Sequence, residues 1–129
     1  MPVVLDSSVV LAYLLDERGR ELAEQAIGAG GVISTVNLAE VMSRLMKDGA
    51  DPTASAEFLL ALPVTVVPLD AGLAITSGAM FAQTRKFGLS LGDRACLALA
   101  KREAVPALTG DRAWLQVAEA VGVEVRLIR

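Results

Sequence analysis

The sequence predicts an α/β fold: a three-layer α/β/α sandwich around a central, mainly parallel sheet of four to five strands. Short β-branched segments alternate with longer segments of helical spacing, and strands that alternate with helices pair in parallel. The composition is 53% hydrophobic and 21% charged, which suits a sheet covered on both faces and excludes a disordered polyelectrolyte. At 129 residues we expect one domain, covering 1–129.

The N-terminal half opens with an apolar strand that ends at Asp6 and leads into a helix. Glycines 28, 30 and 31 end the second helix, because glycine readily adopts the left-handed conformation that follows a helix. They precede a strand instead of opening a helix, so they do not form a dinucleotide-binding loop. Asp48-Gly49 closes the third helix and Asp51-Pro52 opens the fourth. We predict strands at 2–5, 32–34 and 64–67, and helices at 8–15, 18–27, 36–47 and 52–62.

The C-terminal half repeats this alternation. Residues 64–67 form the clearest strand by composition, and Asp70 after it is typical of a helix N-cap. We expect the helix that it caps to continue into the mid-80s. The remaining predicted elements are a helix at 90–103, a strand at 106–109, a helix at 111–121 and a final strand at 123–127.

Cysteine and histidine usage excludes several classes of protein. Cys96 is the only cysteine and there is no histidine, so neither an intrachain disulfide nor a Cys/His zinc site is possible. We interpret Cys96 as a packing residue in an apolar helix. The N-terminus lacks the basic start of a signal peptide, and the longest weakly polar run, 58–69, is shorter than the ~20 residues of a membrane helix. We therefore expect a cytoplasmic protein without a membrane span.

The charge balance sets a condition on any contact with nucleic acid. The net charge is −3 and the pI about 4.9, so no global positive field attracts a polyanion. Nucleic-acid binding would have to rest on a local basic patch, or on divalent cations held by acidic side chains.

Four acidic residues stand out, although each has an ordinary structural explanation. Asp6 and Asp111 precede helices and suit N-caps. Glu40 lies four residues before Arg44, as in an exposed helical ion pair. Asp93 follows Ser90 by three residues, as in a capping box. These explanations remain open for each acid taken singly.

Their joint position favours a metal site. All four acids fall just past the carboxyl ends of strands or in the first turns of helices, the edge where open α/β sheets form their sites. Two carboxylates about 4 Å apart repel by about 4 kcal/mol at an effective dielectric of about 20, so four need a cation or raised pKa values. Oxygen ligands alone favour Mg²⁺ or Mn²⁺ over zinc. Such a site suits phosphodiester hydrolysis by metal-activated water.

A covalent serine mechanism is not expected at this edge. Ser7 and Ser8 follow Asp6 directly, but the chain has no histidine to activate either hydroxyl. We interpret both as hydrogen-bonding or capping groups.

Four segments carry a resemblance that spans nearly the whole chain. VLDSSVVLAYLLDE, the Asn37-Leu-Ala-Glu40 stretch, LSLGDRACLALA and LTGDRAW, in this order, resemble the PIN-domain ribonucleases, specifically the VapC toxins of bacterial type II toxin–antitoxin pairs. The resemblance implies Mg²⁺- or Mn²⁺-dependent endonucleolytic cleavage of RNA. It also implies a homodimer and inhibition by a small cognate antitoxin.

The resemblance assigns roles to particular residues. Asp6, Glu40, Asp93 and Asp111 match the family's acidic, metal-binding and catalytic quartet. Ser8 and Thr109 match hydroxyl residues that we assign to orienting ligands or water. Ala113 stands where some relatives carry a further acid, so the resemblance does not decide between one and two bound metals.

Contacts with RNA rest on fewer signals. Arg94 and Arg112 each follow a quartet acid, so their side chains could reach phosphates beside the metal or could point away. Arg85-Lys86 offers a second basic pair. Trp114 has spacing that suits a core or interface anchor more than a base-stacking residue. We treat Asp70 as an N-cap and not as a fifth ligand.

Two other functions remain open from the sequence. A phosphoaspartyl phosphatase would use Asp6 as nucleophile with an acid two residues later, where Ser8 stands, and a receiver domain would need a lysine after a late strand. A non-catalytic regulatory or binding module would use the same acids only as helix caps. Indifference of function to Asp6→Asn would favour the module.

Overall fold

The computed structural model describes residues 2–129 and contains a five-stranded sheet in which all pairs are parallel. The strand order is β3-β2-β1-β4-β5, so the central strand β1 pairs with β2 through Val4 and Val32, and with β4 through Val4 and Ala107. The strands are β1 (Val4–Leu5), β2 (Val32–Ser34), β3 (Thr65–Val67), β4 (Ala107–Thr109) and β5 (Val125–Leu127). The predicted α/β fold is confirmed.

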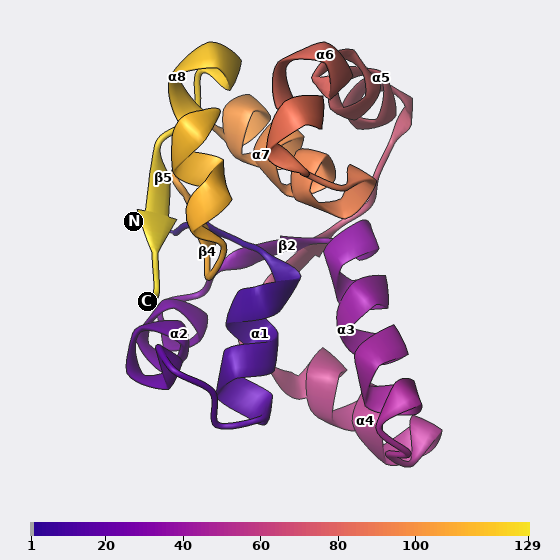
Figure 1. Cartoon of the computed structure of the whole chain (residues 1–129). Coiled ribbons are helices and arrows are strands. Elements are labelled where there is room, and N and C mark those ends of the chain that lie inside the picture. Colours follow the sequence, from indigo (N-terminus) through magenta and orange to yellow (C-terminus); the bar gives the residue numbers. More distant parts are fainter. Residues whose placement is uncertain (1) are drawn as a thin grey trace.

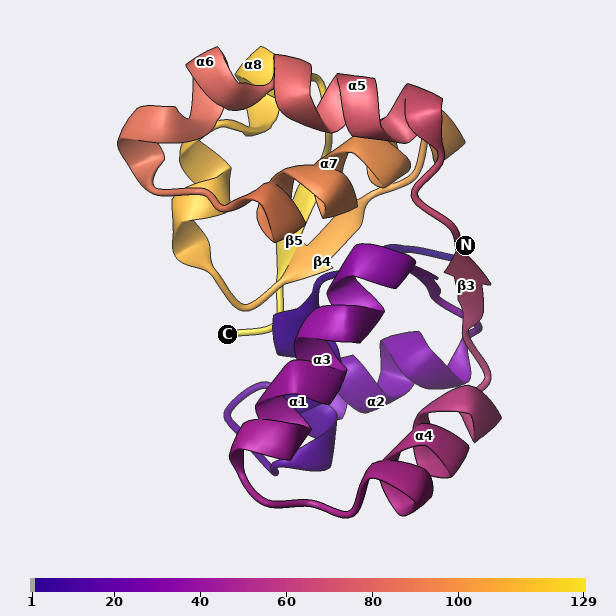
Figure 2. The same ribbon diagram turned by 90° about the vertical axis from the view of Figure 1, so that its right-hand side faces the viewer.

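Helices cover both faces of the sheet (Figure 1). One layer contains α1 (Ser7–Leu14), α2 (Arg20–Gly28), α3 (Thr35–Lys47) and α4 (Pro52–Ala61). The other contains α5 (Ala71–Ala79), α6 (Phe81–Thr84), α7 (Leu91–Glu103) and α8 (Ala118–Val121), with the 3₁₀ helices η1 (Arg85–Phe87) and η2 (Arg112–Gln116). Figure 2 shows the first layer below the strands and the second above them.

Two apolar cores lie on the two faces of the sheet, because successive strand side chains point to opposite faces. Val4 and Ala107 belong to the core beneath α5, α7 and α8, whereas Leu5 and Leu108 belong to the core beneath α1 to α4. Cys96 is fully buried in the first of these cores, which confirms that it is a packing residue.

The predicted helix starts are confirmed by their caps. The carboxylates of Asp51 and Asp70 accept hydrogen bonds from the N–H groups of Ala54 and Leu73. α2 ends at Gly28 and Gly30 has a φ of +84°, a backbone conformation that glycine adopts without strain. These glycines end the helix as predicted.

The helix predicted from 70 to the mid-80s is divided at Met80, which is the C-cap of α5 and the N-cap of α6. Hydroxyls on both sides of this break donate to carbonyls one turn earlier, Ser77 to Leu73 and Thr84 to Met80. Such bonds compete with the helical ladder and bend helices, a local effect that apolar spacing does not reveal.

The helix predicted at 111–121 is instead the 3₁₀ helix η2 followed by the short α8. A 3₁₀ helix places residues three apart on one face, and here Trp114 and Val117 are both fully buried in the same core. The tighter turn therefore buries both side chains within a short connection. Burial of Trp114 confirms its core role and removes it as a base-stacking residue.

Among residues 2–129, none of the helices combines the length and the apolar character needed to cross a lipid bilayer.

Candidate acidic site at the carboxyl edge of the sheet

The strand order places a topological switch point between β1 and β4. The connections from β1 run through α1 and α2 on one face, whereas β4 is reached through α5, α6 and α7 on the other (Figure 2). Open parallel sheets form their sites where the connections leave toward opposite faces in this way. Asp6 directly follows β1, and Asp111 follows β4 after one glycine.

Asp6 is the buried centre of this edge, with only 3% of its surface exposed. Its Oδ2 accepts hydrogen bonds from Ser8 Oγ at 2.7 Å and from Thr109 Oγ1 at 2.8 Å, and its Oδ1 accepts from the Ser7 N–H at 2.8 Å. Burial raises the pKa of the Asp6 carboxyl, although the hydrogen bonds from Ser8 and Thr109 oppose this effect. The hydroxyls of Ser8 and Thr109 thus orient Asp6.

The same hydroxyls tie β1 to β4. Gly110 N–H donates to Ser8 Oγ at 2.9 Å, and Asp111 N–H donates to Thr109 Oγ1 at 3.1 Å. Asp111 itself is exposed, and its Oδ1 accepts from the Ala113 N–H as the N-cap of η2. The network therefore fixes the backbone of Asp111 relative to Asp6.

Glu40 enters the edge from the second turn of α3. Its Oε1 accepts from Asn37 Nδ2 at 2.8 Å, and the same nitrogen donates to the carbonyl of Gly92 at 3.0 Å. A Cβ added to Gly92 would overlap the Glu40 carboxylate, so this carboxylate lies directly on the first turn of α7. Arg44 pairs with Asp48 instead, and the alternative of an exposed Glu40–Arg44 ion pair is wrong.

Asp93 stands next to that contact, in the first turn of α7. Ser90 and Asp93 form a capping box, with Asp93 Oδ2 accepting from the Ser90 N–H at 2.8 Å. The Asp93 pKa is raised to about 6. Burial is the largest cause, the hydrogen bond with the Ser90 backbone opposes it, and the charges of Asp6 and Glu40 add to it. Three acids distant in sequence thus act on one another electrostatically.

The same negative charges also affect the pKa of the Cys96 thiol. Burial raises the pKa of its thiol, and Asp6, Asp93 and Glu40 add to the shift. This concentration of negative charge beneath the first turn of α7 places the three acids in one region.

The four acids do not converge on a single point as their side chains stand. Within residues 2–129, no three Asp, Glu or Cys side chains are close enough to hold one ion between them. Each outer acid is anchored through one oxygen, however, and the other oxygen accepts no hydrogen bond within the described part of the chain. These oxygens are Glu40 Oε2, Asp93 Oδ1 and Asp111 Oδ2.

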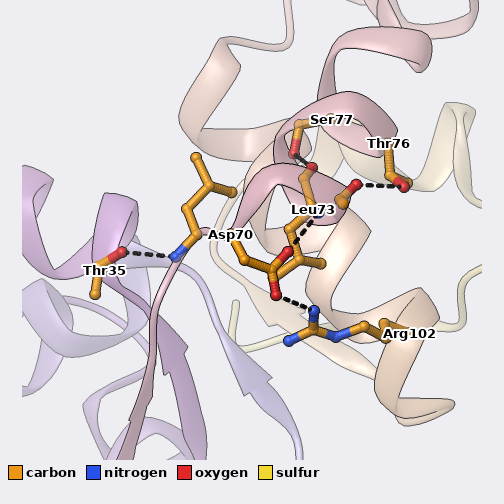
Figure 3. A network of polar contacts seen from close by, with 8 residues as sticks. Thr35, Asp70, Leu73, Thr76, Ser77 and Arg102 are labelled. Atoms are coloured by element: carbon orange, nitrogen blue, oxygen red, sulfur yellow. Dashed lines mark hydrogen bonds and ion pairs between the residues drawn. The ribbon is translucent and has the colours of Figure 1, made fainter.

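Asp70 belongs to a different network. Figure 3 shows its carboxylate between the Leu73 N–H at the start of α5 and the guanidinium of Arg102 at the end of α7, 2.7 Å from Oδ2. The Leu73 backbone bond and Arg102 lower the Asp70 pKa. Both carboxylate oxygens are occupied, so Asp70 is the N-cap that the sequence predicts.

Basic side chains border the acidic site on one side. η1 carries Arg85 and Lys86 and packs against η2, which begins at Arg112, while Arg94 follows Asp93 on α7. Among residues 2–129 these four cations form no salt bridge, in contrast to Arg20, Arg44, Arg102 and Arg126. Two of these cations make cation–π contacts with the exposed Phe81 ring. The guanidinium carbons of Arg94 and Arg85 lie 5.2 and 5.8 Å from the ring centre.

The sequence assigned no role to three residues in and beside this edge. Asn37 is three positions before Glu40, a spacing at which helical side chains meet, and this signal pointed to the contact that the two side chains make. Gly92 carried no such signal. Only the packing of α3 against α7 requires a residue without a side chain at this position. Phe81 was likewise not distinguishable from other apolar positions.

The fold and the four acids together define a class of protein. It is a parallel α/β protein with acidic residues near the point between β1 and β4 where the connections change from one face of the sheet to the other. The chain belongs to the PIN domain family, which it matches over residues 3–120. Comparison with curated proteins gives no match.

Solved structures share this fold at low sequence identity. A DNA-bound VapBC from Salmonella typhimurium has a TM-score of 0.76 at 19% identity, covering 100% of this chain and 99% of that one. VapC20 of Mycobacterium tuberculosis, described as a toxin that cleaves the sarcin–ricin loop, has a TM-score of 0.74 at 20% identity, covering 96% and 98%. VapBC2 of Rickettsia felis, bound to a promoter DNA fragment, has a TM-score of 0.73 at 14% identity, covering 98% of both.

Proposed function

We propose that this chain is a metal-dependent endoribonuclease, formed by a single PIN-like domain over 1–129, that acts as the toxin of a toxin–antitoxin pair. The observation that carries the proposal is the placement of Asp6, Glu40 and Asp93 at the carboxyl edge of the sheet. There Ser8 and Thr109 hold Asp6, and the Glu40 carboxylate lies against Gly92, directly before Asp93. The negative charges of Asp6 and Glu40 contribute to the raised pKa of Asp93, about 6. Carboxylates that repel one another in a partly buried site are stabilised by a bound cation. Membership of the PIN domain family supports the same activity.

The donor set fits Mg²⁺ or Mn²⁺. Hard oxygen ligands suit both ions, and Glu40, Asp93 and Asp111 each keep one carboxylate oxygen without a hydrogen-bond donor within residues 2–129. Binding by all four acids requires side-chain rotation from the arrangement described. A divalent cation held there would lower the pKa of a water molecule and neutralise charge on the scissile phosphate.

The chain's own residues supply orientation. Ser8 and Thr109 hold one oxygen of Asp6 with two hydrogen bonds, and such contacts to ligands typically contribute 10–100-fold to metal affinity or activity. Burial of Asp6 keeps bulk water from competing for this carboxylate. The Asp6 side chain is therefore prearranged, whereas Asp111 lies at the exposed rim and is held through one oxygen as the N-cap of η2.

The cations beside the acids form no salt bridge within residues 2–129, which suits contact with RNA phosphates. Arg112 donates to the carbonyl of Arg129 and Arg94 to that of Ser90, so both guanidinium groups keep their full charge. Arg94 and Arg112 each follow an acid of the site, and Arg85-Lys86 extends the basic border away from it. Cations without a protein carboxylate partner remain available for the phosphate backbone. A local basic border of this kind allows contact with RNA although the net charge of the chain is −3.

The expected partners follow the same proposal. We propose a cognate antitoxin that inhibits the nuclease, a homodimeric assembly and a location in the cytoplasm. Several solved neighbours are described as VapBC or toxin–antitoxin complexes, which supports an antitoxin partner here.

The deciding experiment is a cleavage assay on the purified, antitoxin-free chain with defined RNAs. We expect cleavage with Mg²⁺ or Mn²⁺, none in EDTA, and loss of cleavage in Asp6→Asn and Asp93→Asn with cooperative unfolding retained. Asp51→Asn, which alters only the exposed cap of α4, is the matched control and should retain full cleavage. Undiminished activity in Asp6→Asn would contradict the proposal and favour a non-catalytic module.

A further inference from the structure

Asn37 is a buried amide that joins two of the elements bearing acidic residues. It lies in the first turn of α3 with none of its surface exposed. Its Nδ2 donates to Glu40 Oε1 and to the carbonyl of Gly92. Gly92 directly precedes Asp93. Both partners are acceptors, so the amide nitrogen must face them and the orientation of the side chain is fixed by chemistry.

The other end of this amide is left unsatisfied. Asn37 Oδ1 is buried and has no hydrogen-bond partner within residues 2–129. A buried polar atom without a partner lowers stability, and an apolar side chain of similar volume would avoid the loss. Packing alone therefore does not account for an asparagine here, whereas its two donated bonds do.

Those two bonds hold Glu40 against a surface shaped to receive it. Gly92 has no side chain, and a Cβ there would overlap the Glu40 carboxylate. With Oε1 bound by Asn37, Oε2 accepts no hydrogen bond within the described part of the chain. The carboxylate is thus fixed at one oxygen beside Asp93, with its second oxygen available.

We propose that Asn37 is a positioning residue that orients Glu40 for binding a divalent cation, an inference that rests on the proposed function. The amide acts through Glu40 and does not touch the cation. Its effect on metal binding should therefore disappear when Glu40 itself is replaced, because two residues that act as one unit are not additive.

A purely structural tie between α3 and α7 gives a different expectation. Loss of such a tie lowers the free energy of unfolding and leaves the metal affinity of the folded chain unchanged. Loss of a positioning contact lowers metal affinity in a chain that remains stably folded. Mn²⁺ binding and urea unfolding, measured on the same variants, separate the two roles.

The test is Mn²⁺ binding to the full chain, followed by the electron paramagnetic resonance signal of free Mn²⁺ without RNA. In Asn37→Leu we expect the Kd for Mn²⁺ to rise 10–100-fold, with a urea midpoint equal to or above that of the wild type. Asn37→Ser, too short to reach Glu40, should show the same loss of affinity. Ser77→Ala removes another fully buried polar group, bonded only to Leu73 within α5, and should leave the Kd unchanged.

The double variant decides whether Asn37 acts through Glu40. Asn37→Leu combined with Glu40→Gln should bind Mn²⁺ no more weakly than Glu40→Gln alone. Wild-type affinity in both folded Asn37 variants, or additive losses in the double variant, would overturn the inference while the proposed nuclease stands. Failure of the wild-type chain to bind Mn²⁺ would overturn the proposed function, and this inference with it.

Discussion

Three of the four acids at the carboxyl edge also cap a helix. Asp6 caps α1, Asp93 completes the capping box of α7 and Asp111 caps η2. One carboxylate oxygen accepts the backbone N–H in each case, so capping fixes the side chain and leaves the other oxygen for different contacts. The capping interpretation and the site interpretation of these residues are therefore compatible, and the caps supply the rigidity that the site needs.

The raised carboxyl pKa values predict how stability depends on pH in the metal-free chain. Folding raises the pKa of Asp93 from about 3.8 to about 6 and also raises that of Asp6, so the folded state binds protons more tightly than the unfolded state. The contribution of Asp93 to stability is complete below pH 3.8 and is lost as the pH rises through about 6, and the raised pKa of Asp6 adds a contribution of the same sign. Urea unfolding in EDTA should therefore show a contribution of these groups to the free energy of unfolding that decreases as the pH rises from 3.8 to about 6.

Asp93→Asn is the control for this prediction. Asparagine retains an oxygen that can accept the Ser90 N–H but carries no charge, so the decrease between pH 4 and 6 should become smaller. An identical pH dependence in the variant and the wild type would contradict the raised pKa of Asp93. Added Mn²⁺ should offset the decrease in the wild type, because a cation stabilises the ionised form.

At the scale of elements, how far the sequence predicts the structure depends on which forces decide each segment. Strands and long helices follow hydrophobic spacing and caps, so their order and the edge that gathers the acids were predictable. The break at Met80 and the 3₁₀ helix η2 depend on hydroxyl bonds and on the burial of Trp114 and Val117. The position of Glu40 against Gly92 depends on how α3 and α7 pack, which is a tertiary contact without a local signal.

The basic border formed by η1, η2 and the start of α7 predicts how RNA binding responds to salt. Each phosphate contact that is lost reduces the slope of log K against log salt by about one unit. Arg94→Ala and Arg112→Ala should each weaken binding to a single-stranded RNA in a catalytically inactive Asp6→Asn background and reduce this slope. Fluorescence anisotropy at several salt concentrations measures both quantities.

Arg44→Ala is the matched control for this series, because Arg44 is paired with Asp48 in the last turn of α3. Its removal should leave both affinity and slope unchanged. Equal effects of Arg44 and Arg94 would mean that binding follows total charge and not the local border.

At the scale of the whole molecule, large apolar side chains are exposed on both helical layers. Ile75 on α5 is 73% exposed and Leu60 on α4 is 71% exposed. These two side chains are the positions at which we test the homodimer that we propose.

Light scattering on the purified chain should give twice the mass of one chain at micromolar concentration. Of the two variants Ile75→Lys and Leu60→Lys, the one at the dimer interface should shift the mass to that of a monomer, while the other acts as its control. A wild-type chain that remains monomeric over this concentration range would contradict the dimer.

The pairing of the first strand with the fourth has a consequence for synthesis on the ribosome. Asp6 is synthesised 103 residues before its hydrogen-bond partner Thr109, and Asp111 follows two residues later. A nascent chain that ends before β4 therefore lacks one hydroxyl that orients Asp6 and one of the four acids. Under the proposed function, the complete acidic site cannot form until the segment that carries β4 and Asp111 has left the exit tunnel.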